Sequence, residues 1–308
     1  MQSDSTSHIR TLNKEAEAIY RQNPARAEEL ARKAQTLAHE IGDRAGLAES
    51  LLNIASVCWR TERYAEGIKK AREALALFTA LDDARGKALT FLRMGLLYQS
   101  ITDMNEALLA YQESLKWAEH IGDENILAGI LNNMGVLYID LADYAAALDT
   151  LLKASTLFQK VGDLYGEALL RNNIGLIYYR LNKDCQSALR EYQESLKIFE
   201  WLNSKTDIAR MLRNLGAVYE GLKDYDNAIC TLEKALRICE EINSPNGIAN
   251  AKYNLAYVYA NKGEREKAIQ LLLEALAICE QTSNRILMAN ACLDIGRLYA
   301  KQPIKAKS

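Results

Sequence analysis

The stretch "LNNMGVLYIDLADYAAALDTLLKAS" at residues 131–155 decides the fold, because its pattern returns at 212–236 as "LRNLGAVYEGLKDYDNAICTLEKAL". Both stretches carry apolar residues at helical spacing, and each places a glycine, Gly135 or Gly216, inside a predicted helix. A glycine in a helix interior costs about 1 kcal/mol relative to alanine. Its recurrence therefore indicates a point where two helices cross and a larger side chain would push them apart. Tyr138, three residues after the first glycine, is expected to fill the gap beside it.

Equivalent positions recur every 40 residues along most of the chain, as Gly95, Gly135 and Gly175 show. The periodicity defines six repeats, at 44–83, 84–123, 124–163, 164–204, 205–244 and 245–284. A less regular helical pair at 8–43 precedes them, and a partial repeat at 285–308 follows. Because a fixed period of this length is typical of stacked repeats, the sequence predicts a single solenoid domain over residues 1–308.

Each repeat has the pattern of two helices, with apolar residues at i, i+3, i+4 and i+7. The dipeptide "GD" at 42–43, 122–123 and 162–163 is typical of a glycine that ends one helix and an aspartate that caps the next. The dipeptide "NS" at 203–204 and 243–244 is expected to do the same, because asparagine tolerates the left-handed conformation. The sequence therefore predicts about fifteen helices and no β-sheet.

The composition argues against several classes of function. The chain has 308 residues with 38 basic and 40 acidic side chains, so no excess of positive charge indicates nucleic-acid binding. The N-terminal "MQSDSTSHIR" lacks the apolar core of a signal peptide, and no apolar run approaches the roughly 18–20 residues that span a bilayer. The six cysteines form no C-x-x-C pair and are interpreted as reduced thiols, which predicts a cytoplasmic protein. Cys239 and Cys279 lie 40 residues apart at matching repeat positions, which favours a packing role for these two.

No catalytic arrangement is visible in the sequence. The three histidines, His8, His39 and His120, lie far apart and lack partners at the spacing of a metal or acid–base site. Neither a phosphate-binding loop nor a dinucleotide fingerprint occurs. The sequence therefore predicts a protein that is not an enzyme and that binds no metal or cofactor.

The recurring order "N-x-G-x-x-Y … D-Y-x-x-A … A" resembles the tetratricopeptide repeat, and the resemblance covers residues 8–308. The 40-residue spacing exceeds the usual length of about 34 residues. It is similar to the lengthened repeats of LGN-type scaffolds, kinesin light chains and bacterial Rap-like proteins. The resemblance implies an all-α fold, a right-handed superhelical α-solenoid of antiparallel helix pairs. It also implies that the first helix of each repeat lines a concave groove.

In this family geometry, one inward-facing column lies two residues before the small residue, and it is rich in asparagine. Asparagine is a mediocre helix former, but its amide offers both the donor and the acceptor that an extended peptide backbone requires. The resemblance therefore implies a groove that binds a partner. The residues assigned to it, from this column and its inward-facing neighbours, are Asn53, Arg93, Asn132, Asn133, Asn172, Asn173, Tyr179, Arg180, Arg210, Arg213, Asn214, Asn250, Tyr253, Asn254, Tyr257, Asn290 and Arg297. An alternative stays open, in which each asparagine amide bonds to the neighbouring helix.

The inward positions carry more positive than negative charge. Seven are positive (Arg60, Arg93, Arg180, Arg210, Arg213, Arg297 and Lys301) and four are negative (Glu49, Asp140, Glu220 and Asp294), so the difference, seven minus four, is +3. On a chain whose net charge is −2, this favours an acidic segment or a free C-terminal carboxylate as the ligand.

The leading hypothesis is an interaction scaffold that binds a peptide or a helical segment of a partner protein in its groove. A second hypothesis is the N-terminal sensory or regulatory region of a larger bacterial signalling enzyme, such as a cyclase, a diguanylate cyclase or a histidine kinase. A third is a receptor for small secreted peptides. The last residues, "LYAKQPIKAKS", resemble the start of an uncapped second helix, through which the chain is expected to self-associate.

Overall fold

The computed structural model describes residues 2–181, 184–282 and 284–300. Within these ranges fifteen α-helices follow one another, and no strand occurs. The helices are α1 (Gln2–Ile19), α2 (Pro24–Ile41), α3 (Arg44–Arg60), α4 (Tyr64–Ala80), α5 (Ala84–Ser100), α6 (Met104–Ile121), α7 (Glu124–Asp140), α8 (Tyr144–Val161), α9 (Leu164–Leu181), α10 (Cys185–Trp201), α11 (Lys205–Gly221), α12 (Tyr225–Glu241), α13 (Pro245–Lys262), α14 (Arg265–Thr282) and α15 (Arg285–Ala300). The predicted all-α fold is confirmed, although α1 begins earlier than the predicted start at residue 8.

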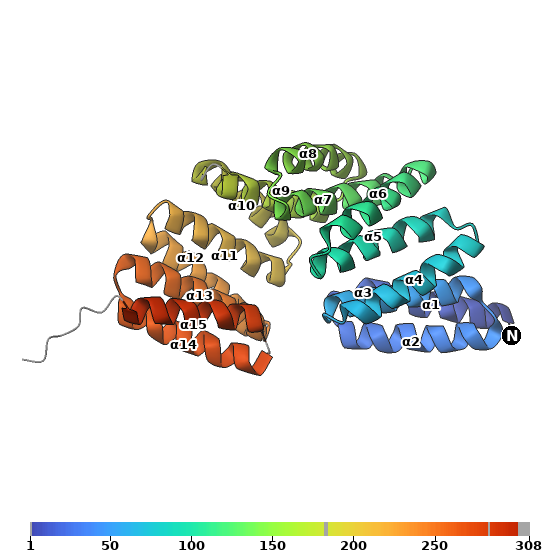
Figure 1. Ribbon diagram of the computed structural model, residues 1–308, viewed down its shortest axis with the longest axis horizontal. Coiled ribbons are helices and arrows are strands. Elements are labelled where there is room, and N and C mark those ends of the chain that lie inside the picture. The colour runs from blue at the N-terminus through green and yellow to red at the C-terminus, as the bar shows by residue number, and fades with distance from the viewer. Residues whose placement is uncertain (1, 182–183, 283, 301–308) are drawn as a thin grey trace, which may run out of the picture. The chain divides into compact units, whose positions relative to one another are not determined.

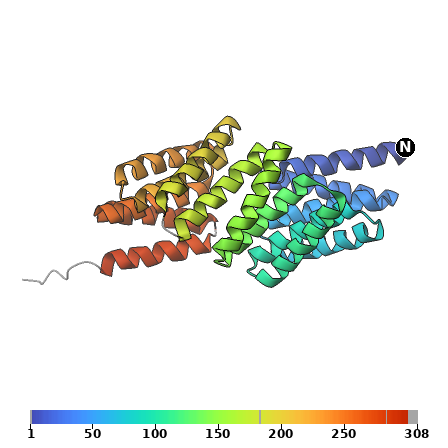
Figure 2. The same cartoon turned by 90° about the horizontal axis from the view of Figure 1, so that it is seen from above.

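Within each of two compact units, the helices form antiparallel pairs that stack in chain order (Figures 1 and 2). Their contacts divide the chain into two compact units, residues 1–163 with α1–α8 and residues 164–308 with α9–α15. We call these unit 1 and unit 2. Within each unit, every helix packs against its neighbours in the chain, which is the architecture of an α-solenoid of helix pairs. The predicted fold class is therefore confirmed, whereas a single domain over the whole chain stays a prediction.

Side-chain caps and left-handed residues set the helix boundaries where the sequence predicts them. Before α7, the carboxylate of Asp123 accepts a hydrogen bond from the backbone amide of Ile126 at 3.1 Å. The preceding Gly122 has a φ of 67°, a left-handed conformation that only glycine adopts without cost. Asn203 and Asn243 take the same conformation, with φ of 53° and 50°. The predicted helix ends are confirmed, and Ser244 caps α13 by accepting from the backbone amide of Gly247 at 3.3 Å. The predicted cap at Ser204 is wrong, because its hydroxyl donates to Asp207 instead of accepting from a backbone amide.

The recurring glycines lie where the two helices of a pair cross. A Cβ atom added to Gly135 of α7 would lie 2.5 Å from Cδ2 of Leu151 on α8. At Gly95 of α5 it would lie 2.4 Å from a ring carbon of Tyr111 on α6. Both opposing side chains are fully buried. The crossing is therefore confirmed, but the prediction that Tyr138 fills the gap is wrong, because the atoms nearest the glycine belong to the second helix.

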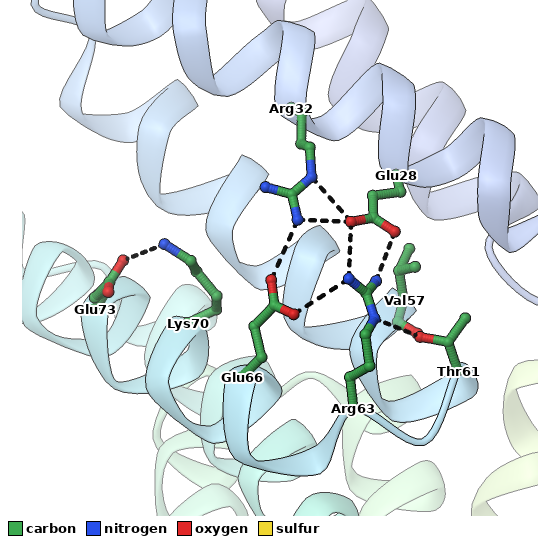
Figure 3. Close-up of polar contacts among 8 residues, drawn as sticks. All are labelled: Glu28, Arg32, Val57, Thr61, Arg63, Glu66, Lys70 and Glu73. Carbon is green, nitrogen blue, oxygen red and sulfur yellow. Dashed lines mark hydrogen bonds and ion pairs between the residues drawn. The ribbon is translucent and has the colours of Figure 1, made fainter.

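A cluster of four charged side chains links α2 to the start of α4 in unit 1 (Figure 3). The guanidinium of Arg63 lies 2.5 Å from Glu28 and 3.2 Å from Glu66, and that of Arg32 lies 2.6 Å from Glu28 and 3.2 Å from Glu66. Burial alone would raise the pKa of Glu28, but hydrogen bonds from Arg63 and Arg32 lower it. Each carboxylate thus binds two arginines, and the cluster fixes one helix pair against the next.

Candidate functional site

The first helices of the pairs form one layer of each unit. In unit 1, α1 contacts α3, α3 contacts α5, and α5 contacts α7, while in unit 2 α11 contacts α13 and α13 contacts α15. Among the described helices, no such close backbone approach joins one second helix to the next, although side chains of the charged cluster link α2 to α4. The first helices are therefore the more closely packed layer, as expected of the inner side of a stack of pairs. All residues predicted to bind a partner lie on these helices.

Arg93 of α5 lies between two aromatic rings in unit 1. Its guanidinium carbon is 5.2 Å from the centroid of the Tyr20 ring and 5.5 Å from that of the Trp59 ring. Its Nε and Nη1 atoms are buried, with no hydrogen-bond partner among the described residues. Cation–π attraction takes the place of those bonds and contributes about 0.5–2 kcal/mol per ring. Burial alone would raise the pKa of Tyr20, but the charges of Arg93 and Arg21 lower it to about 8.

The predicted groove asparagines of unit 1 differ in their surroundings. Asn53 of α3 is 9% exposed, and its Nδ2 donates to the backbone oxygen of Asn13 on α1 at 3.0 Å. This contact matches the alternative in which the amide bonds to the neighbouring helix. Asn132 is buried as well, whereas Asn133 is half-buried and forms no side-chain hydrogen bond to any described residue. In unit 1, Asn133 is thus the asparagine whose amide is available.

Unit 2 has a small cavity on its layer of first helices, with a volume of about 230 Å³. We call it the unit 2 cavity. It is lined by residues of α9, α11, α12 and α13, namely Tyr179, Ala217, Glu220, Leu232, Tyr253, Asn254, Tyr257 and Val258. Tyr179, Tyr253, Asn254 and Tyr257 are among the residues that the sequence assigns to the groove. The structure thus brings these four together, and their role in binding stays a prediction.

Hydrogen bonds fix two of the tyrosines of the unit 2 cavity. The hydroxyl of Tyr179 donates to the backbone oxygen of Ala217 at 3.3 Å, and that of Tyr253 donates to the carboxylate of Asp294 at 2.7 Å. Burial and then Asp294 raise the pKa of Tyr253 to about 12, and burial and then the charge of Glu220 raise the pKa of Tyr179. Glu220 lines the cavity and Asp294 is bonded to Tyr253, so two carboxylates lie at or beside it.

Two polar groups of the unit 2 cavity are available to a ligand. The Asn254 amide forms no hydrogen bond to any residue that the structure describes. Glu220 accepts one hydrogen bond, from Nδ2 of Asn261 at 2.7 Å. The cavity therefore offers an amide donor, an amide acceptor and a carboxylate beside three aromatic rings.

The other asparagines of unit 2 are bonded or exposed. Nδ2 of Asn214 donates to Oδ1 of Asn172 at 2.8 Å, and Nδ2 of Asn172 donates to Oδ1 of Asn173 at 3.1 Å. These three amides join α9 to α11, which again matches the alternative role in helix packing. Asn250 donates to a backbone oxygen of its own helix at 2.7 Å, and Asn290 is exposed on α15.

Neighbouring acids neutralise part of the predicted positive charge. Arg210 and Arg297 each pair with an aspartate on their own helix, at 2.7 and 3.1 Å. Burial lowers the pKa of Arg213, whose Nε lacks a hydrogen-bond partner among the described residues. Arg180 is exposed, and Lys301 lies outside the described residues. Simple counting of inward charges therefore overstates the positive character of this layer.

Several residues of these sites were not assigned from the sequence, among them Tyr20, Leu232 and Glu220. Tyr20 follows α1, in the irregular first pair, where the repeat register gives no position for it. Leu232 comes from α12, a second helix. Glu220 was counted only as an inward charge, although it lies four residues after Gly216, just as Tyr179 lies four residues after Gly175. That shared register is the signal that would have placed Glu220 in the site.

Other candidate sites are less informative. In the described part of the chain, no group of histidine, cysteine and acidic side chains could hold a metal ion. No helix in that part combines the length and the apolar character that a bilayer crossing requires. A hollow of about 310 Å³ lies over α12, α13 and α14, but its cations are engaged, since Lys262 pairs with Asp226 at 2.9 Å and Lys267 lies 3.9 Å from the centroid of the Tyr259 ring.

Sequence comparison gives one family. A family model described as a tetratricopeptide repeat matches residues 46–119, 126–200 and 207–281. A search of curated proteins found no match.

Solved structures with a similar fold include three proteins of related architecture. A Rap protein complexed with competence and sporulation factor is 13% identical, with 98% of this chain and 99% of that chain covered and a TM-score of 0.66. NprR in complex with its cognate peptide NprX is 15% identical, with 96% and 85% covered and a TM-score of 0.68. A signal-transduction ATPase with numerous domains from Pyrococcus horikoshii, which has a tetratricopeptide repeat sensor, is 16% identical, with 89% and 42% covered and a TM-score of 0.66. At these identities the likeness shows the fold alone, and this chain spans less than half of the ATPase.

Proposed function

This chain belongs to the tetratricopeptide repeat family, whose model matches three successive segments of it, and we propose that it binds a peptide or a helical segment of a partner protein along its layer of first helices. The observation that carries the proposal is the unit 2 cavity, where three predicted tyrosines line the same space as the Asn254 amide, which has no hydrogen-bond partner among the described residues. NprR, which has a similar fold, was solved with its cognate peptide, and this supports the same use of the fold here.

In the proposed binding mode, contacts to the backbone of the bound segment give affinity and contacts to its side chains give specificity. The Asn254 amide donates to a carbonyl and accepts from an N–H of the bound segment, which gives affinity without dependence on its sequence. The three tyrosines hold one side chain of the segment and give specificity. Arg180, exposed on α9, and Arg93 in unit 1 are the groups that an acidic residue or a C-terminal carboxylate of the partner would meet. We assign no catalytic step to this arrangement.

A peptide selection with two variants tests the proposal. Peptides are selected from a random library against the full chain and then titrated as synthetic peptides. Asn254→Ala should weaken their binding by about 0.5–1.5 kcal/mol for each lost hydrogen bond. Its melting temperature should not fall, because alanine is the better helix former. Gln270→Ala, which removes an exposed amide from the second helix α14, is the matched control and should change neither. Selected peptides that bind Asn254→Ala as tightly as the parent chain would show that the site is elsewhere.

A second candidate function is the regulatory array of a longer signalling protein in the cytoplasm. The multidomain ATPase from Pyrococcus horikoshii supports it, because a sensor of the same repeat type is part of a much longer chain there. The mass of the protein isolated from its native source distinguishes the two candidates. A mass close to 34.5 kDa favours the separate scaffold, and a larger mass with an attached catalytic domain favours the regulatory array.

Self-association through the last repeat is a further part of the proposal. Ile286, Leu293 and Tyr299 on α15 are 79%, 60% and 52% exposed, so this helix presents apolar surface to solvent. Sedimentation of the parent chain and of Leu293→Glu tests this. A parent chain that is monomeric at high concentration contradicts it.

A further inference from the structure

The unit 2 cavity combines aromatic rings with a carboxylate that has no cationic partner among the described residues. Tyr179 lines it from α9, Tyr253 and Tyr257 from α13, and Glu220 from α11. Glu220 takes a hydrogen bond from the neutral amide of Asn261 and forms no ion pair with any residue that the structure describes. The faces of aromatic rings are negative, so rings and carboxylate attract a cation together.

The positive groups near the unit 2 cavity do not neutralise it. Arg297 of α15 is close enough to influence Tyr253, but it pairs with Asp294 at 3.1 Å. Arg180 and Arg213, on α9 and α11, do not line the cavity. Burial is the largest cause of the raised pKa of Tyr179 and Tyr253, and Glu220 and Asp294 add to it.

The size of the unit 2 cavity fits one side chain. Its volume of about 230 Å³ is below the range of roughly 300–1,000 Å³ that is typical of small-molecule sites. The hydroxyls of Tyr179 and Tyr253 are anchored, so these rings need no rearrangement to form a wall. Tyr257 is 53% exposed, which leaves the cavity open on that side. A side chain projecting from a bound segment can therefore enter it.

We propose that the unit 2 cavity binds a lysine or arginine side chain of the partner segment, with its cation held between the tyrosine rings and the carboxylate of Glu220. The proposal rests on the peptide binding proposed above and adds the chemistry of one bound residue. A neutral or acidic side chain fits the cavity less well, because burial of Glu220 beside it would leave that carboxylate without a counter-charge.

Two small compounds that differ only in charge test the proposal on the full chain. Nα-acetyl-arginine amide and Nα-acetyl-citrulline amide have side chains of nearly the same shape, but only the first is cationic. Each is titrated into protein with 13C-labelled tyrosine rings and followed by NMR. The arginine compound should shift the resonances of Tyr179, Tyr253 and Tyr257, and it should bind about tenfold more tightly than the citrulline compound.

Two variants that each remove one negative charge complete the test. Glu220→Gln can still accept the hydrogen bond of Asn261, so the variant should fold normally and bind both compounds equally weakly. Glu240→Gln removes an exposed carboxylate from the second helix α12 and should preserve the tenfold preference. Equal binding of the two compounds by the parent chain, or no change at these tyrosines with either compound, overturns the proposal.

The test separates this proposal from the peptide-binding function. If the chain selects peptides but does not discriminate between the two compounds, the peptide-binding function stands and the proposed binding of a basic side chain is overturned. If the chain prefers the arginine compound but selects no peptide, the cation site stands and the peptide-binding function is overturned.

Discussion

Two glycines of α7 give opposite predictions for the same substitution. At Gly135, an added Cβ atom would lie 2.5 and 2.6 Å from Cδ2 and Cγ of Leu151, whereas at Gly129 nothing lies within 4 Å. Comfortable carbon–carbon contacts are about 3.5–4.0 Å, so Gly135→Ala must displace a fully buried leucine or separate α7 from α8. Overpacking of this kind costs about 1–3 kcal/mol.

Comparing Gly135→Ala with Gly129→Ala removes the effect of helix propensity, because both variants replace a helical glycine with alanine. Both variants gain up to about 1 kcal/mol because alanine replaces glycine within a helix. Gly129→Ala should therefore stabilise the chain by up to that amount, and Gly135→Ala should be about 1–3 kcal/mol less stable than Gly129→Ala. Urea unfolding followed by circular dichroism measures the difference.

A second substitution identifies the contact. Leu151→Ala alone should cost about 2–5 kcal/mol. The double variant Gly135→Ala/Leu151→Ala should be more stable than the sum of the single effects by about 0.5–3 kcal/mol, because the new methyl group enters the vacated space. Strict additivity, or a Gly135→Ala chain as stable as Gly129→Ala, would refute the crossing explanation.

The remaining predictions concern the charged cluster, a turn and a tyrosine. The folded-state pKa of Glu28 is lowered from 4.5, so its contribution to stability is present above that pH and is lost as the pH falls through the lowered value. Glu28→Gln should therefore flatten the dependence of the unfolding free energy on pH in this acidic range. An unchanged pH dependence contradicts this. Ala142, exposed with a φ of 58°, should be replaceable by glycine with a gain of about 0.5–1 kcal/mol, and a lower urea midpoint for Ala142→Gly would count against it. Ultraviolet titration should show one tyrosine ionising near pH 8, and Arg93→Met should raise that pKa; a profile insensitive to this variant would mean that Arg93 does not act on Tyr20.

The fold was predictable because its determinants are local and repeated. Gly135 marks a crossing and Asp123 begins a helix wherever they occur in the period, so sequence spacing predicts the helix pairs and most boundaries. The residue that fills each crossing was assigned wrongly, because it depends on which side chain of the second helix lies opposite. That relation is set by the packing of α8 on α7, and the periodicity of one helix does not contain it.

The candidate site was predictable only in part. The inward register grouped Tyr253, Asn254 and Tyr257, and the structure places them around one cavity. Whether an asparagine amide is available depends on distances between helices: Asn214 reaches Asn172, whereas Asn254 has no such partner among the described residues. The sequence column treats these asparagines as equivalent, so it could not separate a packing role from a binding role.

The residues that build each helix pair and the residues predicted to face a partner occupy different positions of the repeat. Glycines at the crossings and aspartates at the caps hold each pair together. Residues of the first-helix layer such as Asn254 and Tyr257 belong neither to a crossing nor to a cap. Because each pair contacts only nearby pairs, a change on the inner face is felt over a short range. Evolution can therefore vary a position such as Asn254 one repeat at a time without altering a crossing or a cap, whereas a change at Asn214 also removes its contact with Asn172 on the neighbouring pair.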